Sequence, residues 1–451
     1  MTDTLPEGSM SRKSVIGYGL PGFVTAIPII PIAILLPSFY ASELGLGFTL
    51  TGIALGLARL IDFFSDIVIG LAVDRVHWTK RDGSVLHFKP WLITGGVIAA
   101  IGLFALARPT AFDNAAAGAI YLGAWSCVLF LGWTCVMVPY TAWGAVLAED
   151  THGRSRLTVA REAAGLVGML IALTAPIAVL NYSITPLTLI SALAIIAGVP
   201  LFAYTILRVP ESFHKTAAAN PDKVALSDIG QLLRFRPYRF TVICWFLNSL
   251  ANGLPAVLFP IVAMNYLGFD EKGLFILLFL YFGAGVLAAS VWLNMAKRFS
   301  KISAWQVAMV LNISVFSLVL FIDPQSSGLF GSSIFYAICC LSGLSLAADM
   351  ALPASLQADV MAADRLLHHK ERTATAFALW SMATKLALAA AVTVGFVSLG
   401  SAGENFDATD DNAKWLLLTL YVCVPVALKI GVITLLRRFP FELLEIRKPA
   451  R

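Results

Sequence analysis

Charged residues are scarce in this chain. Asp, Glu, Lys and Arg make up 13% of its 451 residues, whereas an average soluble domain carries about 25%. Hydrophobic residues make up 58%, and the mean hydropathy is +0.81. This composition argues against a soluble enzyme and is typical of a polytopic membrane protein. The net charge of +5 does not indicate nucleic-acid binding, because the basic residues lie in short segments between apolar runs.

Cysteine and histidine are also rare. The six cysteines lie within apolar runs and form no CxxC pair near histidines, so we expect buried thiols, no disulfide framework and no zinc site. The six histidines lie between the apolar runs. No HExxH, GxSxG or Walker motif occurs in a suitable context, and no filter-like repeat is visible. We therefore expect neither an enzyme nor a channel, and no cofactor.

Long apolar runs dominate the sequence. A bilayer-spanning helix needs about 20 apolar residues. Such spans are expected at 15–40, 48–74, 90–108, 117–148, 161–181, 185–207, 239–266, 273–295, 304–323, 331–358, 373–399 and 414–436. The sequence thus predicts an all-α polytopic membrane protein with twelve transmembrane helices in two six-helix bundles, 1–208 and 239–451, joined by a cytoplasmic linker at 209–238. In transporters built this way, the substrate lies near the bilayer midplane where the halves meet.

The basic residues indicate the topology. All but six of the 32 Lys and Arg residues lie in the N-terminal segment, in alternate loops or after the last span; the six are Arg59, Arg108, Lys272, Lys385, Lys414 and Lys429. By the positive-inside rule, both termini and the linker are expected in the cytoplasm. The first run is too long for a signal-peptide core and lacks a clear cleavage site, so we expect it to remain as a span.

Ionisable residues gather within the second apolar run, where charge is costly unless it faces a polar interior. Spacings of three and four residues put Arg59, Asp62 and Asp66 on one helical face. Two adjacent carboxylates repel unless they bind a cation, share a proton or pair with a nearby arginine. One arginine does not neutralise two acids. A coupling-ion site for Na⁺ or H⁺ is therefore favoured over an internal salt bridge, with Ser65 adding a nearby oxygen.

Further polar residues lie within spans of the second half. Lys385, in the eleventh run, needs a polar or acidic partner. Its candidate partners are Asp349 in the tenth run and the Asp62/Asp66 pair. Lys429 lies nearer the end of its run, so we expect its ammonium group to reach the membrane interface.

The fourth and fifth runs add three candidates. Thr134 can offer another hydroxyl to the ion. Arg161 can either extend to the interface or point into a cavity. The aromatic rings of Trp133 and Tyr140 can stack on a sugar or fill the core.

Several motifs are distributed along almost the whole chain. They are R-x-x-D-x-x-x-D-x-x-x-G (59–70), F-K-P-W (88–91), P-Y (139–140), R-x-R-L-x-x-x-R (154–161), A-D-V (358–360), E-R (371–372) and the lysine at 385. Together they resemble the glycoside-pentoside-hexuronide:cation symporters, the melibiose permease-like family of the major facilitator superfamily. The resemblance implies cation-coupled transport by alternating access in a bacterial inner (plasma) membrane.

The resemblance also implies roles for individual residues. The implied cation ligands are Asp62, Ser65, Asp66 and Thr134. The implied or inferred substrate-binding and coupling positions are Arg59, Arg161, Lys385, Asp349, Trp133, Tyr140, Met137 and Ala26. Ala26 and Met137 stand where the family has acids that bind sugar hydroxyls. Their loss predicts poor binding of simple galactosides, because the hydroxyls would be buried unpaired.

The function expected from the sequence is symport of a small organic solute, such as a sugar, glycoside or uronate, with Na⁺ or H⁺. The alternative is a symporter of a lysophospholipid or another amphiphile, and a remote alternative is a non-transporting membrane enzyme or receptor. The expected partners are the substrate and the lipid bilayer. Neither nucleic acid nor an obligate protein partner is predicted.

Overall fold

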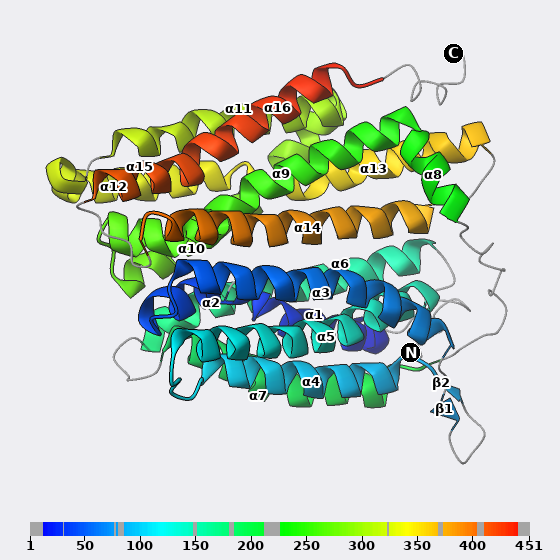
Figure 1. Ribbon diagram of the computed structural model, residues 1–451. Coiled ribbons are helices and arrows are strands. Elements are labelled where there is room, and N and C mark those ends of the chain that lie inside the picture. Colours follow the sequence, from blue (N-terminus) through cyan, green and yellow to red (C-terminus); the bar gives the residue numbers. More distant parts are fainter. Residues whose placement is uncertain are drawn as a thin grey trace, which may run out of the picture. The chain divides into compact units, whose positions relative to one another are not determined.

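The computed structural model describes residues 12–29, 31–75, 78–79, 85–147, 151–179, 185–211, 226–322, 324–368, 373–403 and 410–440. The chain divides into two compact units, Met1–Ala217 and Ala218–Arg451. Nearly every described element in both units is a helix (Figure 1). This confirms the predicted all-α fold class.

The first unit contains six spans. Its helices are α1 (Arg12–Ala26), η1 (Pro31–Leu35), α2 (Leu36–Ser38), η2 (Phe39–Glu43), α3 (Phe48–Arg75), α4 (Lys89–Ala107), α5 (Ala115–Leu147), α6 (Thr151–Val179) and α7 (Pro186–Arg208). Between α3 and α4, strands β1 (Trp78–Thr79) and β2 (Val85–Leu86) pair antiparallel, with Trp78 opposite Leu86.

The second unit also contains six spans. Its helices are α8 (Leu226–Arg234), α9 (Arg236–Pro260), η4 (Ile261–Tyr266), α10 (Glu271–Arg298), α11 (Lys301–Phe316), η5 (Ser317–Phe321), α12 (Pro324–Gly343), α13 (Leu346–His368), α14 (Thr373–Gly400), α15 (Asp411–Leu418), η6 (Thr419–Cys423) and α16 (Val424–Arg437). Part of the predicted polar linker is therefore helical, since α8 lies within it.

The number of spans agrees with the prediction. Among the described residues, ten helices are long and apolar enough to cross a membrane. The other two spans are the proline-interrupted first span, which includes the shorter apolar helix Ile32–Glu43, and α3 with its internal charges. Proline removes a backbone donor and clashes with the preceding turn, which accounts for the division of the first span into several helices.

The tenth span differs from the continuous helix expected at 331–358. It is interrupted between α12 and α13, with turns at residues 344–345. An interruption inside a membrane must satisfy the backbone groups that it releases. The indole Nε1 of Trp292 donates to the carbonyl oxygen of Leu344 at 2.6 Å, and Asn312 Nδ2 donates to Ser345 Oγ at 3.0 Å. Side chains of neighbouring helices therefore support the break.

Glycines bring helix backbones close together in the first unit. A Cβ atom added to Gly132 of α5 would lie 2.4 Å from the backbone nitrogen of Ala99 in α4. A Cβ atom added to Gly22 of α1 would lie 2.4 Å from the carbonyl oxygen of Arg161 in α6. Small residues permit this close packing, which drives helix association in membranes. The second contact fixes the position of Arg161 along the axis of α1.

Candidate functional site

The predicted cation ligands meet where α3 packs against α5. The hydroxyl oxygen of Thr134 lies 3.2 Å from Asp62 Oδ1 and 3.0 Å from Asp66 Oδ1. Ser65 Oγ lies 3.4 Å from the same threonine oxygen and donates to the carbonyl oxygen of Asp62 at 2.8 Å. Asp62 and Thr134 are 5% and 2% exposed, so this cluster lies inside the unit.

The chemistry of this cluster favours a bound cation or proton. A threonine hydroxyl has one proton, so it can donate to only one of the two carboxylates at a time. Asp62 and Asp66 both lie within hydrogen-bond distance of Thr134, so their two carboxylates share one hydroxyl oxygen as a neighbour. Binding a hard cation among these oxygens, or sharing a proton between the acids, relieves their repulsion.

Arg59 interacts only loosely with this cluster. Its Nη1 atom lies 3.9 Å from Asp62 Oδ2, close to the limit for an ion pair. Its guanidinium carbon lies 4.1 Å from the ring centroid of Phe130, in a cation–π contact. Arg59, Asp62 and Asp66 carry a net charge of −1 when all three are ionised. Arg59 therefore balances at most one of the two carboxylate charges.

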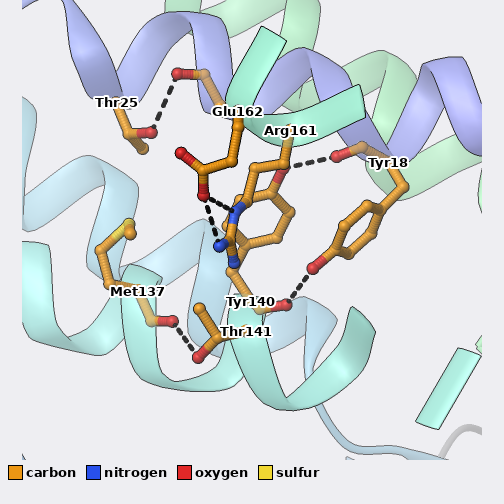
Figure 2. A network of polar contacts seen from close by, with 8 residues as sticks. Tyr18, Thr25, Met137, Tyr140, Thr141, Arg161 and Glu162 are labelled. Carbon is orange, nitrogen blue, oxygen red and sulfur yellow. Dashed lines mark hydrogen bonds and ion pairs between the residues drawn. The ribbon is translucent and has the colours of Figure 1, made fainter. Parts of the chain in front are cut away.

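A second cluster of polar side chains joins α1, α5 and α6 (Figure 2). The hydroxyl of Tyr18 donates to the carbonyl oxygen of Tyr140 at 2.9 Å, and the hydroxyl of Tyr140 donates back to the carbonyl oxygen of Tyr18 at 2.5 Å. Their ring centroids are 4.8 Å apart. Tyr140 is fully buried. Its hydroxyl and ring therefore connect α1 to α5. A role of Tyr140 in substrate binding stays a prediction.

Arg161 forms an ion pair with its neighbour Glu162. Its Nη2 and Nε atoms lie 2.7 and 3.2 Å from Glu162 Oε1. The Arg161 side chain is 22% exposed and that of Glu162 is 66% exposed. Figure 2 shows Thr25, Met137 and this pair facing one another from three helices. No role was predicted for Glu162 from the sequence, although an acid within a predicted span was the available signal.

The remaining first-unit candidates lie in other environments. Ala26 is buried on α1, and a Cβ atom added to Gly165 of α6 would lie 3.6 Å from its methyl group. Trp133 lines an apolar groove together with residues of α1, α4 and α7. The structure thus places Met137 and Arg161 near one another, and Trp133 in an apolar groove that Thr25 also lines.

In the second unit, Asp349 lies at the centre of a buried cluster. Its Oδ2 atom lies 3.0 Å from Lys429 Nζ and accepts from Asn252 Nδ2 at 3.1 Å. Its Oδ1 atom accepts from Trp305 Nε1 at 2.7 Å. Lys429 also donates to Asn248 Oδ1 at 3.2 Å. These side chains come from α9, α11, α13 and α16, and together they satisfy a carboxylate and an ammonium group inside the helix bundle.

This cluster corrects the expectation for Lys429. We expected its ammonium group to reach the interface, but the residue is 2% exposed because Asp349 and Asn248 hold it inside the bundle. Asp349 was also a candidate partner of Lys385, and its ion pair is with Lys429 instead. Lys385 lies partly buried on α14. Its placement near the Asp62/Asp66 pair stays a prediction.

The fold and its buried charges define an integral membrane protein of the major facilitator type. Residues 17–442 match the family described as MFS/sugar transport protein, and the chain belongs to this family. The fold resembles that of two crystal structures. One is a D-xylose-proton symporter, with a TM-score of 0.64 and 14% identity, covering 93% of this chain and 95% of that one. The other is a mutant of the nucleoside transporter NupG, with a TM-score of 0.66 and 12% identity, covering 94% of this chain and 100% of that one.

Three curated relatives are 20–28% identical to this chain, two of them over about a third of it. The uncharacterized symporter YjmB of Bacillus subtilis (strain 168) is 20% identical over 435 residues, which are 95% of this chain and 92% of that protein. The glucuronide carrier protein homolog of Escherichia coli (strain K12) is 26% identical over 156 residues, 34% of this chain and 32% of that protein. The inner membrane symporter YicJ of the same organism is 28% identical over 33% of this chain and 31% of its own length.

Proposed function

We propose that this protein is a cation-coupled symporter of a small polar solute in the class of sugars, glycosides and uronates. The observation that carries this proposal is that buried Asp62 and partly buried Asp66 both lie within hydrogen-bond distance of the Thr134 hydroxyl. Membership of the sugar-transport family and the similarity to named symporters support the same function. The coupling cation is Na⁺ or H⁺, and the protein transports its substrate without chemically altering it.

Helix α5 is the element that connects the cation site with the substrate site. Thr134 contacts both acids, and Met137 lies about one turn further along the same helix. A cation that draws Asp62, Asp66 and Thr134 together restrains α5 against α3. A substrate seated against the Met137 segment then meets an ordered surface. Because coupling between two sites is reciprocal, the substrate must also raise the affinity for the cation.

The Arg161–Glu162 pair supplies the polar contacts of the proposed substrate site. Where the family has acids on the first and fourth spans, this chain has Ala26 and Met137 instead. Glu162, on the neighbouring helix α6, offers an acceptor for hydroxyl groups, and Arg161 offers donors. The apolar side chains at 26 and 137 also favour the second candidate, an amphiphilic substrate such as a lysophospholipid. We propose that the protein lies in the inner membrane with both termini in the cytoplasm, as the positive-inside rule predicts.

Thermal stability of the purified chain tests these proposals. A ligand that binds only the folded state raises the melting temperature by mass action. We expect a sugar, glycoside or uronate to stabilise the protein more in the presence of its coupling cation than without it. Stabilisation that depends on Na⁺ at constant pH assigns sodium coupling, whereas a dependence on pH alone assigns proton coupling. Stabilisation by lysolipids but by none of the sugars would replace the first candidate with the second.

A further inference from the structure

An apolar groove of about 470 Å³ lies on the first unit, between α1, α4, α5 and α7. Its lining includes Gly96 and Val97 of α4, Val199 and Leu207 of α7, and Trp133 of α5. Val97, Val199 and Leu207 are exposed. The volume falls in the range of small-molecule sites, about 300–1,000 Å³. The groove is therefore large enough to hold more than a single side chain.

The groove exists because small residues line two facing helices. Gly96, Ala99 and Ala100 of α4 lie opposite Ala194 and Gly198 of α7. Unlike the tightly packed Gly132, Gly96 has no heavy atom within 4 Å of an added Cβ. A glycine inside a helix costs about 1 kcal/mol relative to alanine. Helix packing does not require this glycine, and its effect is to leave the groove open.

Positively charged residues lie beyond one end of the groove, outside its lining. Leu207 lines the groove, and Arg208 follows it as the exposed last residue of α7. Thr205 Oγ1 donates to the carbonyl oxygen of Gly17 at 2.6 Å, which holds this end of α7 beside the beginning of α1. Arg12 and Lys13 there are also exposed. Three exposed cations thus lie at the end of the bundle where α7 ends and α1 begins.

We propose that this groove binds an anionic phospholipid of the bilayer. One acyl chain lies along the apolar lining between α4 and α7. Arg208, together with Arg12 and Lys13, binds the phosphate group. The apolar lining alone would not select one lipid, because it is no more apolar than the surrounding acyl chains. Basic residues at the membrane surface attract anionic headgroups and so provide the selectivity. This proposal does not rest on the proposed transport function.

Native mass spectrometry of the full chain in detergent tests the site, with phosphatidylglycerol and phosphatidylcholine of identical acyl chains as probes. We expect phosphatidylglycerol to bind more tightly. One basic residue near the surface contributes about fivefold to the affinity for an anionic lipid. Arg208→Gln should therefore weaken binding of phosphatidylglycerol about fivefold and leave that of phosphatidylcholine unchanged. Equal binding of the two lipids to the unsubstituted protein, or no loss in Arg208→Gln, would overturn the proposal.

A groove-filling variant tests the acyl-chain position separately. Gly96→Leu should reduce retention of phosphatidylglycerol, because its side chain enters the open groove. Gly283→Leu in α10 is the matched control, since Gly283 also has no heavy atom within 4 Å of an added Cβ. Equal retention by the two variants contradicts the proposal. A phospholipid with a photoactivatable acyl chain provides a test on the unsubstituted protein: cross-links concentrated on α4 and α7 are expected, and an even spread over all lipid-facing helices would refute it.

Discussion

The ammonium nitrogen of Lys429 lies 3.0 Å from Oδ2 of Asp349, inside the second unit. Both residues are almost fully buried, at 2% and 6% exposed. Removing two charges from water costs more than most ion pairs recover, so such a pair persists only with additional hydrogen bonds. Asn248, Asn252 and Trp305 provide these bonds. The pair is therefore part of a hydrogen-bonded network, and replacing either residue alone should destabilise the protein.

Lys429→Met should destabilise the protein by about 3–5 kcal/mol, because it leaves the Asp349 carboxylate buried without its counter-charge. Adding Asp349→Asn to this variant should restore more than half of the loss, since the neutral amide retains an acceptor for Trp305. The free energy of unfolding in detergent, measured as a double-mutant cycle, checks both values. Additive losses in the double variant would show that the two charges do not stabilise each other.

Asp62→Asn should abolish uptake driven by a cation gradient while leaving the protein folded. The substitution removes one of the two negative charges about Thr134 but keeps the shape of the side chain. Uptake into proteoliposomes under an imposed Na⁺ or pH gradient measures the effect. Asp113→Asn, at an exposed position between α4 and α5, is the matched control and should transport normally. Concentrative uptake at the normal rate by Asp62→Asn would refute the cation site.

Thr134→Val should weaken cation binding about tenfold to 100-fold. It removes a hydroxyl that approaches both acids, and a hydrogen bond to a charged group contributes about 1.5–3 kcal/mol. The cation concentration giving half-maximal stabilisation is the measurement. Thr174→Val in α6 removes an exposed hydroxyl that donates to the carbonyl oxygen of Leu170, so its cation affinity should not change. Unchanged affinity in Thr134→Val would exclude its hydroxyl as a ligand.

Glu162→Gln should affect neutral and acidic substrates in opposite directions. The substitution removes the negative partner of Arg161 and leaves its guanidinium available to a substrate carboxylate. We expect a higher KM for neutral glycosides and an equal or lower KM for uronates, with unchanged cation affinity. Glu43→Gln, at the exposed end of η2, is the control. An equal change for both substrate classes would show that Glu162 does not contribute to their discrimination.

Much of the fold could be predicted from hydropathy alone. A membrane span needs about 20 apolar residues whatever its neighbours are, so the twelve spans were visible as runs. The interruption of the tenth span was not predicted, although Ser342, Gly343 and Ser345 stand at the break. What supports the break is a donor on another helix, Trp292, which reaches the carbonyl oxygen of Leu344.

For the candidate sites, sequence and tertiary structure determined different things. Helical periodicity alone puts Asp62 and Asp66 on one face, since they are separated by one turn. The approach of Thr134 to both acids depends on the packing of α5 against α3, over a sequence separation of 72 and 68 residues. The same reason applies to Lys429: the sequence established a lysine within an apolar run, but only the helices around it decided that its charge is held inside the bundle by Asp349.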